Sequence, residues 1–83
     1  MTLVLLSVVV RKKNGIVFSG NAKSVTSYNL LGTFDILPQH TNFVSVISKK
    51  LEVVTSDNTL MKISFDRGVM RVKKDRVEIF LEV

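Results

Sequence analysis

The sequence predicts an all-β fold, either a sandwich or a barrel. Turn-forming residues recur at close spacing, for example at Asn14-Gly15, Leu31-Gly32 and Lys73-Lys74-Asp75. The segments between them are rich in Val, Ile, Leu, Thr and Phe, the residues that suit a pleated strand. No stretch of ten or more residues has the period of 3.6 that an amphipathic helix requires. With 83 residues, the chain has room for one domain, residues 1–83.

Further turns are predicted where Gly, Pro, Asn, Asp or Ser gather. These are Gly20-Asn21, Pro38-Gln39, Ser48–Lys50, Ser56-Asp57-Asn58 and Arg67-Gly68. Gly20 and Gly32 are expected to adopt positive φ, which glycine tolerates. Pro38 is expected to end a strand, because it has no N–H to donate to a neighbouring strand.

Three segments alternate apolar and polar residues with the period of two that a half-buried strand shows. They are Ala22–Tyr28, which alternates weakly, Leu60–Phe65 and Arg76–Val83. In the last, Val77, Ile79 and Leu81 share one face, and Phe80 falls on the polar face. We expect Phe80 to fold against a neighbouring strand rather than to serve as a surface anchor.

Two segments are apolar on both faces: Leu3–Val10 and Phe43–Ile47. A strand of this kind either lies at a closed corner, buried on both sides, or presents its outer face to another subunit. Leu3–Val10 is too short for a membrane helix, which needs about 20 residues. It also precedes the basic residues 11–13, the reverse of a signal peptide. The expectation is a soluble cytoplasmic protein.

Composition argues against an enzyme. There is no cysteine, which excludes a disulfide, a thiolate zinc site and a cysteine nucleophile. The single histidine, His40, has no recognisable partner and is interpreted as a turn residue. Glu78 and Glu82 are about 13 Å apart on a strand, too far for a glycosidase pair. The four glycines are isolated, so there is no phosphate loop. No cofactor and no metal are expected.

The chain carries 12 Lys and Arg against 7 Asp and Glu, a net charge of +5. The cations form three clusters: residues 11–13, residues 49–50, and the group Arg67, Arg71, Lys73, Lys74 and Arg76. Folds that bind single-stranded nucleic acid stack bases on exposed aromatic residues beside such cations. Of the aromatic residues, only Tyr28 and Phe80 fall at positions that could be exposed. Neither lies within a cluster in the sequence, although Phe80 is near one. We therefore interpret the clusters as solvated turns and expect no nucleic-acid partner.

Residues 17–40 resemble a known family. They contain Val17-Phe18-Ser19-Gly20, then Lys23-Ser24-Val25, then Gly32-Thr33-Phe34-Asp35-Ile36-Leu37-Pro38-Gln39-His40. This order is similar to the aromatic-x-Gly, x-Ser-Val and Glu-Gly-x-x-Gly-Ile-Leu-Pro-x-His motifs of the N-terminal β-sandwich of F-type ATP synthase epsilon subunits (delta in mitochondria). The resemblance implies a flattened two-sheet β-sandwich of about ten short strands, over nearly the whole chain.

The family's later Gly-Gly-x-x-x-Val strand is similar to residues 67–72, with Arg67 in place of the first glycine. Other departures are Arg11-Lys12 for Thr-Pro, Leu31 for the motif's glutamate, Asp35 for a glycine, and Thr41-Asn42 for Ala-Pro. Family members normally continue into a C-terminal helical hairpin. The sequence stops at Val83, so we expect the sandwich without that hairpin.

The resemblance implies a non-catalytic central-stalk subunit, which couples proton-driven rotation to ATP synthesis by binding the gamma subunit and the membrane c-ring. Such a subunit is cytoplasmic and peripheral to the inner face of the cell membrane through the complex. The implied c-ring contacts are Tyr28, Asn29, Leu30, Leu31, Gly32 and Thr33. The implied gamma contacts are Lys12, His40 and Ser45, to which the doubly apolar strand adds Val44 and Val46. The missing glutamate favours a polar or hydrophobic contact with the ring over an ion pair.

Two alternative functions stay open from the sequence. One is a stand-alone basic β-module that binds nucleic acid, which a steep salt dependence of binding would support. The other is an interaction domain that associates with itself through its apolar strands.

Overall fold

The computed structural model describes residues 4–39 and 42–82. Within them the chain forms six β-strands and no helix. The strands are β1 (Leu6–Lys12), β2 (Gly15–Asn29), β3 (Gly32–Ile36), β4 (Phe43–Thr55), β5 (Leu60–Lys73) and β6 (Arg76–Glu82). The predicted all-β class is confirmed. No helix in this part of the chain is long and apolar enough to cross a membrane.

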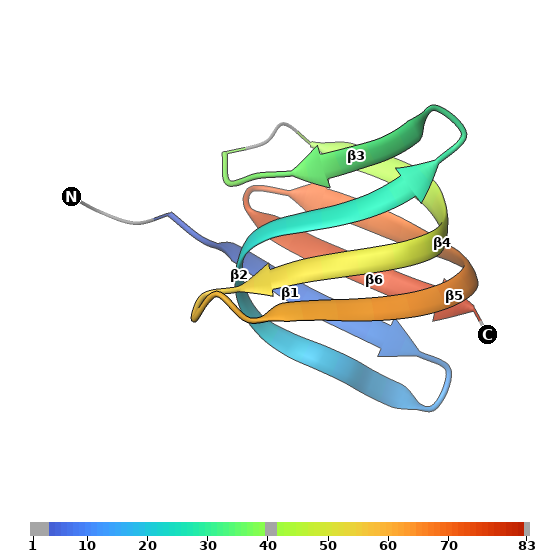
Figure 1. Cartoon of the computed structure of the whole chain (residues 1–83), viewed down its shortest axis with the longest axis horizontal. Helices are drawn as coiled ribbons and strands as arrows, with labels where there is room; N and C mark the ends of the chain where they lie inside the picture. Colours follow the sequence, from blue (N-terminus) through green and yellow to red (C-terminus); the bar gives the residue numbers. More distant parts are fainter. Residues whose placement is uncertain (1–3, 40–41, 83) are drawn as a thin grey trace.

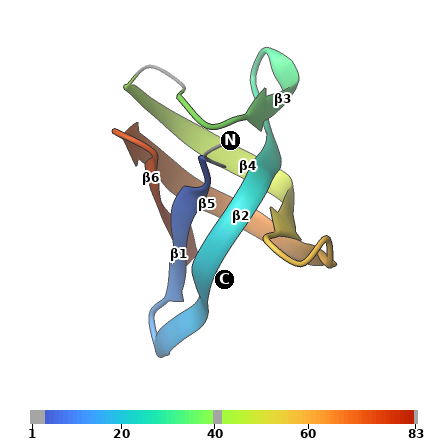
Figure 2. The same cartoon turned by 90° about the vertical axis from the view of Figure 1, so that its left-hand side faces the viewer.

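The strands form one sheet that closes on itself. The order is β1-β6-β5-β4-β2-β3, and β1 also pairs with β2, so five strands form a barrel and β3 extends it beside β2 (Figure 1). β1 runs antiparallel to β2 and parallel to β6, which leaves it hydrogen-bonded on both sides. Figure 2 shows β1 and β2 side by side, seen from one end of the molecule. The expectation of two sheets with about ten short strands is wrong.

Three predicted turns explain the wrong strand count. Gly20-Asn21, Ser48–Lys50 and Arg67-Gly68 all lie inside long strands, β2, β4 and β5. At Ser48/Lys49 the register of β4 against β5 shifts, and Lys49 has a φ of 71°. A β-bulge of this kind bends a strand and increases its twist without reversing the chain. Strands that bend around a small barrel need such irregularities, and their residues resemble those of turns.

The glycine expectations are half right. Gly32 has a φ of 113° and ends the turn between β2 and β3, as expected. Gly20 does not have positive φ; it lies in β2, and a Cβ there would come 3.2 Å from Cζ of Phe18. Gly20 therefore makes room for an aromatic ring. Pro38 follows the end of β3 at Ile36, in agreement with its expected role.

The core lies inside the barrel and receives alternate residues from all six strands. Its buried apolar side chains are Leu6, Val8, Val10, Ala22, Val25, Ile36, Ile47, Leu51, Val53, Met70, Val72, Val77, Ile79 and Leu81. Phe34 and Phe43 pack on it with ring centroids 5.4 Å apart. The predicted alternation of β6 is confirmed, since Val77, Ile79 and Leu81 are buried while Glu78, Phe80 and Glu82 are exposed.

Candidate interaction surfaces

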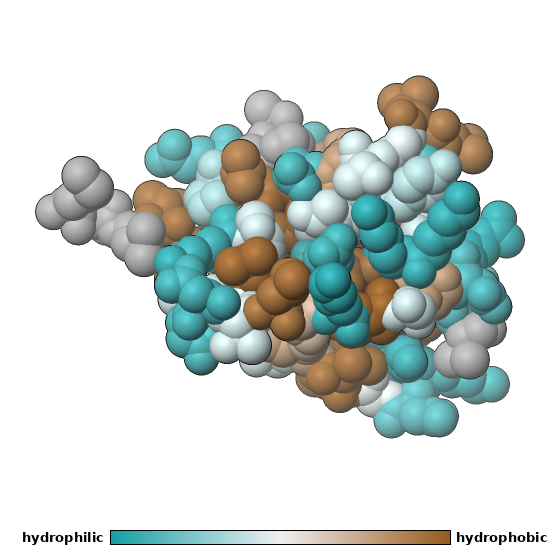
Figure 3. All heavy atoms as spheres, in the orientation of Figure 1, coloured by the Kyte–Doolittle hydropathy of each residue, from teal (hydrophilic) through white to brown (hydrophobic). Residues whose placement is uncertain are grey.

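The first candidate surface is the tip of the β2–β3 hairpin, which contains the predicted c-ring contacts. Asn29 pairs with Gly32, so Leu30 and Leu31 form a two-residue loop. Both leucine side chains are almost completely exposed, at 104% and 96% of their reference areas. Figure 3 shows this tip as a hydrophobic protrusion at the upper right, where Figure 1 has the β2–β3 turn.

Hydrogen bonds at the base of the hairpin hold this loop in place. Oδ1 of Asn29 accepts from the backbone N–H of Leu31 at 2.9 Å, as in an Asx-turn. Nδ2 of Asn29 donates to Oγ of Ser45 on β4 at 3.2 Å. Next to it, Nζ of Lys49 lies 4.4 Å from the ring centroid of Tyr28, a cation–π contact. Tyr28, expected to be exposed, is therefore half-buried under a lysine.

A hollow of about 190 Å³ lies beside this loop, between β3 and the start of β4. Its lining includes the apolar side chains of Leu31, Phe34 and Phe43, and also Asn29 and Thr33. The candidate c-ring residues thus stand together at one end of the barrel. The loop and the hollow form one surface of exposed leucine and partly buried phenylalanine.

The second candidate surface is the outer face of β4, β5 and β6. In β4, Val44 and Val46 are 69% and 56% exposed, while their neighbour Ile47 is fully buried. Of the two interpretations of the doubly apolar segment Phe43–Ile47, burial on both sides is therefore wrong in this chain. Its outer face is free of cover from the described residues.

This face continues across two more strands. Val46 lies opposite Val69 of β5, and Val69 lies opposite Phe80 of β6. Directly paired residues point to the same side of a sheet, so these side chains form a line. We call Val44, Val46, Val69 and Phe80 the apolar row. Val69 is 46% exposed and Phe80 52%, so the expectation that Phe80 folds against a neighbouring strand is wrong.

Charged side chains border the apolar row. A hollow of about 150 Å³ lies against Val69 and Phe80, and Arg11, Arg71 and Glu78 line its edge. Sequence reasoning had identified Val44 and Val46 but missed Val69, and it assigned Phe80 to a covered position. The missing information was the register, since only strand pairing shows that residues from three strands are adjacent.

The other predicted gamma contacts do not lie in the apolar row. Ser45 is on the opposite side of β4 from Val44 and Val46, where its hydroxyl receives the bond from Asn29 and donates to the carbonyl of Val46 at 3.0 Å. Lys12 is half-buried at the end of β1 and lines a separate hollow with Phe65 and Glu82. His40 lies outside the described residues. The structure therefore does not bring the predicted set together on one face.

The polar side chains of the described residues form few charged contacts. Among them, no group of three or more His, Asp or Glu side chains is placed to hold a metal ion. The described part of the chain has one ion pair, between Lys50 and Glu52 at 3.9 Å, and no buried side-chain polar atom without a partner. Among the described residues, six of the eleven exposed large apolar residues lie at the β2–β3 tip or in the apolar row. The other five are Val4, Ile16, Val17, Leu37 and Leu60.

These features define a small, closed all-β domain with apolar residues on two outer surfaces. Residues 5–83 match the family described as "ATP synthase, Delta/Epsilon chain, beta-sandwich domain". The chain belongs to this family.

Two curated relatives agree with the family match. The ATP synthase epsilon chain of Helicobacter pylori (strain HPAG1) is 30% identical over 82 residues, which cover 99% of this chain and 65% of the relative. That of Clostridium botulinum (strain Eklund 17B / Type B) is 32% identical over 79 residues, covering 94% of this chain and 58% of the relative. The chain thus spans less than two thirds of the length of these relatives.

Solved structures show the same fold at low sequence identity. A chain of the Euglena gracilis mitochondrial ATP synthase (OSCP/F1/c-ring) superposes with a TM-score of 0.87 at 14% identity, covering 98% of this chain and 52% of that one. A chain from the central stalk and c-ring of the Tetrahymena thermophila mitochondrial ATP synthase gives 0.77 at 15% identity, covering 94% and 63%.

Proposed function

We propose that this chain is the β-domain of a non-catalytic epsilon-type subunit in the central stalk of a proton-translocating F-type ATP synthase. It performs no bond chemistry. It binds the gamma subunit and the c-ring and, by staying rigid, transmits rotation between them. In this role it is cytoplasmic and attached to the inner face of the cell membrane through the complex.

The observation that carries the proposal is the apolar row. Its four side chains are between 46% and 69% exposed and lie on three adjacent strands of a rigid barrel. Exposed apolar residues grouped in this way are typical of a protein interface. Full burial of an exposed Val or Phe side chain contributes about 1.5–3 kcal/mol. These side chains are about half exposed, so a partner that covers the row gains part of this from each. We assign the row to the gamma subunit.

The β2–β3 tip is assigned to the c-ring. Leu30 and Leu31 are exposed at the end of a hairpin whose base is held by Asn29. Since Leu31 occupies the position of the family's glutamate, the contact is hydrophobic rather than an ion pair. The β2–β3 hairpin and β4 are connected through the hydrogen bond between Asn29 and Ser45, so a force on the tip reaches β4 directly.

The experiment is a pull-down of the gamma subunit from the same genome, repeated at about 0.5 M salt, which reduces the screening length to a few ångströms. Salt-resistant binding at one-to-one stoichiometry is the expected result. Absence of binding would contradict the proposal and reduce the assignment to common ancestry. Size-exclusion chromatography of the chain alone tests the alternative of self-association, which a stable dimer would support.

A further inference from the structure

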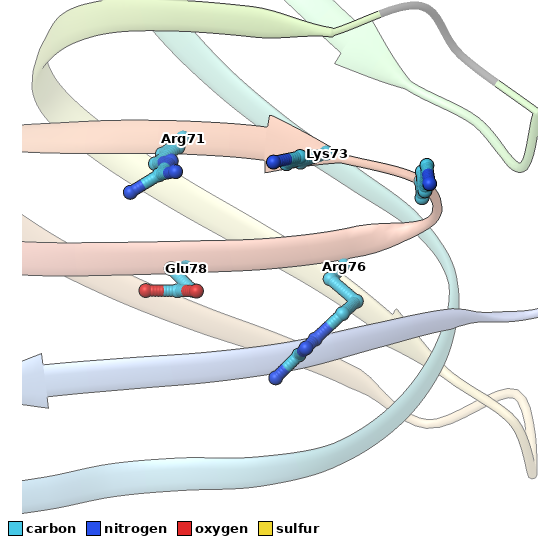
Figure 4. A pocket seen from close by; sticks show the side chains of 5 residues that line it. Arg71, Lys73, Arg76 and Glu78 are labelled. Atoms are coloured by element: carbon cyan, nitrogen blue, oxygen red, sulfur yellow. The ribbon is translucent and has the colours of Figure 1, made fainter.

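The β5–β6 hairpin carries a group of cations around one hollow. The hollow has a volume of about 260 Å³ and is lined by Arg71 and Lys73 of β5, Lys74 of the turn, and Arg76 and Glu78 of β6 (Figure 4). We call Arg71, Lys73, Lys74 and Arg76 the basic hollow. Four cations against one carboxylate leave a net charge of +3 within a small volume. All five side chains belong to exposed residues.

The strand register places like charges directly opposite each other. Lys73 pairs with Arg76 across the hairpin, and this arrangement destabilises a sheet. The nearby Asp75 does not line the hollow, and its Oδ1 accepts a hydrogen bond from the backbone N–H of Gln39 at 2.5 Å. Glu78 is opposite Arg71, but the described residues form an ion pair within 4 Å only between Lys50 and Glu52. The basic hollow therefore lacks internal compensation for its charge.

The turn adds a second local cost at the same place. Lys74 and Asp75 both have positive φ, 49° and 61°. A two-residue hairpin turn of this kind favours Asn-Gly, and a lysine there is uncommon. The like-charge pair Lys73–Arg76 and the lysine at positive φ, Lys74, are both unfavourable for folding, and both add cations to the same hollow. Local conflicts of this sort occur in natural proteins mainly where a site has a function.

We propose that the basic hollow binds a small soluble anion that carries adjacent phosphoryl groups, of which pyrophosphate is the simplest. The guanidinium groups of Arg71 and Arg76 match phosphoryl oxygens with two parallel hydrogen bonds each, and lysines add point charges. A single carboxylate supplies one negative charge, whereas a diphosphate supplies enough to offset the charge of +3. No aromatic side chain lines the hollow itself, and the exposed Phe80 lines the adjoining hollow, which shares Arg71 and Glu78.

This site adjoins the surface assigned to gamma, since Arg71 and Glu78 also line the hollow against Val69 and Phe80. Its test uses the chain alone and does not depend on the synthase. Calorimetric titration of the 83-residue chain with pyrophosphate at low salt is expected to show one binding site. Thermal unfolding is expected to shift to higher temperature as pyrophosphate is added, because a ligand that binds only the folded state stabilises it.

The informative variant is Lys73→Glu. It replaces a like-charge pair with an opposite-charge pair opposite Arg76, so it is expected to unfold at a higher temperature than the parent chain without ligand. It is also expected to bind pyrophosphate at least about tenfold more weakly, since a charge-assisted bond is lost and a repulsion is added. The matched control is Lys13→Glu, the same charge change at the exposed turn between β1 and β2.

The proposal is overturned if pyrophosphate does not bind, or if Lys13→Glu weakens binding as much as Lys73→Glu does. Equal losses of affinity in the two variants would mean that pyrophosphate is attracted by the overall charge of the chain and not by this hollow. The proposal is also overturned if oligothymidylate binds more tightly than pyrophosphate and this binding is abolished in Lys73→Glu. The surface would then be a nucleic-acid site.

Discussion

Asn29 and Ser45 connect the β2–β3 hairpin with β4, the strand that carries Val44 and Val46, with Nδ2 of Asn29 donating to Oγ of Ser45 across 3.2 Å. Asn29 stands at the base of the exposed Leu30-Leu31 loop, and Ser45 lies between the exposed Val44 and Val46. The hairpin tip and the outer face of β4 are therefore fixed relative to each other by a side-chain bond as well as by strand pairing. A subunit that transmits torque requires such a rigid connection.

The coupling between these two residues is measurable by a double-mutant cycle. Asn29→Ala, Ser45→Ala and the double variant are expected to give a coupling of about 0.5–1.5 kcal/mol in the free energy of unfolding. Asn29→Ala alone is expected to cost more than Ser45→Ala, because it also removes the acceptor of the Leu31 N–H. Urea unfolding checks this, and additive effects would show that the bond contributes nothing.

A charge in the apolar row should separate binding from stability. Val46→Glu is expected to weaken gamma binding at least about tenfold, because it places an unpaired charge in a buried interface. Its free energy of unfolding should change by only about 0.5 kcal/mol, since Val46 is exposed in the free chain. Calorimetry with the gamma subunit and thermal unfolding are the two measurements.

The neighbour Ile47 provides the opposite pattern as a control. Ile47→Ala is expected to cost about 2–5 kcal/mol of stability, because Ile47 is fully buried, and to leave the affinity of the folded fraction unchanged. If Val46→Glu lost stability to a similar extent and kept its affinity, the apolar row would not be the gamma surface.

Removal of the leucines at the hairpin tip should affect only attachment to the c-ring. The double variant Leu30→Ser/Leu31→Ser is expected to bind gamma normally and to unfold at nearly the parent temperature, because both side chains are exposed. Assembly onto c-ring-containing membranes, measured by co-sedimentation with the gamma subunit, is expected to fall severalfold. Sedimentation at the parent level would exclude the tip as a ring contact.

Gly68 has no space for a side chain. A Cβ at this position would come 2.8 Å from the carbonyl oxygen of Phe80 and 3.0 Å from Cδ2 of Leu81. Gly68→Ala is therefore expected to separate β5 from β6 slightly and to cost about 1–3 kcal/mol. Gly20→Ala is the comparison; its Cβ would meet only the Phe18 ring, at 3.2 Å, which can rotate away. Chemical unfolding measures both variants, and a larger loss of stability in Gly20→Ala than in Gly68→Ala would contradict this prediction.

The turn between β4 and β5 gives the chain an acid-sensitive element. The hydroxyl of Thr55 donates to the carboxylate of Asp57, and this bond, followed by bonds from Thr59, lowers the pKa of Asp57 below its ordinary value of 3.8. A depressed pKa in the folded state contributes stability above pH 3.8, and this contribution is lost as the pH falls through the folded-state pKa.

Asp57→Asn keeps an acceptor at this position but does not titrate. The variant is expected to be less stable than the parent chain at neutral pH, and the difference is expected to shrink as the pH is lowered below 3.8. Urea unfolding at a series of pH values measures the difference. If the difference in the free energy of unfolding between the parent and Asp57→Asn stayed constant or increased as the pH fell, the lowered pKa of Asp57 would be contradicted.

The sequence allowed prediction of the fold class and of the faces of individual strands. The alternation in residues 76–82 correctly identified Val77, Ile79 and Leu81 as core. It could not distinguish a bulge from a chain reversal, because both accommodate positive φ; Lys49 at 71° in mid-strand and Asn58 at 68° in a true turn use the same conformation. The number of strands was therefore overestimated, because positions where a long strand bends were predicted to be turns.

The candidate surfaces were predictable only in part, for a related reason. The β2–β3 tip is local in sequence, so its residues could be named together. The cations of the basic hollow are also close in sequence and were named as one cluster. The apolar row combines residues from three strands, and which of them are opposite each other depends on register. A one-residue shift would move Val69 and Phe80 to the interior.

The pairing of β1 with β6 has a consequence for synthesis. The first strand of the barrel lies against the last, with Val8 opposite Val77, so the barrel cannot close until residues 76–82 have left the ribosome. Until then the apolar edge of β1 has only β2 as a neighbour. Contacts this distant along the chain make folding slow. The pairing of β1 with β6 is therefore the step that closes the barrel during synthesis.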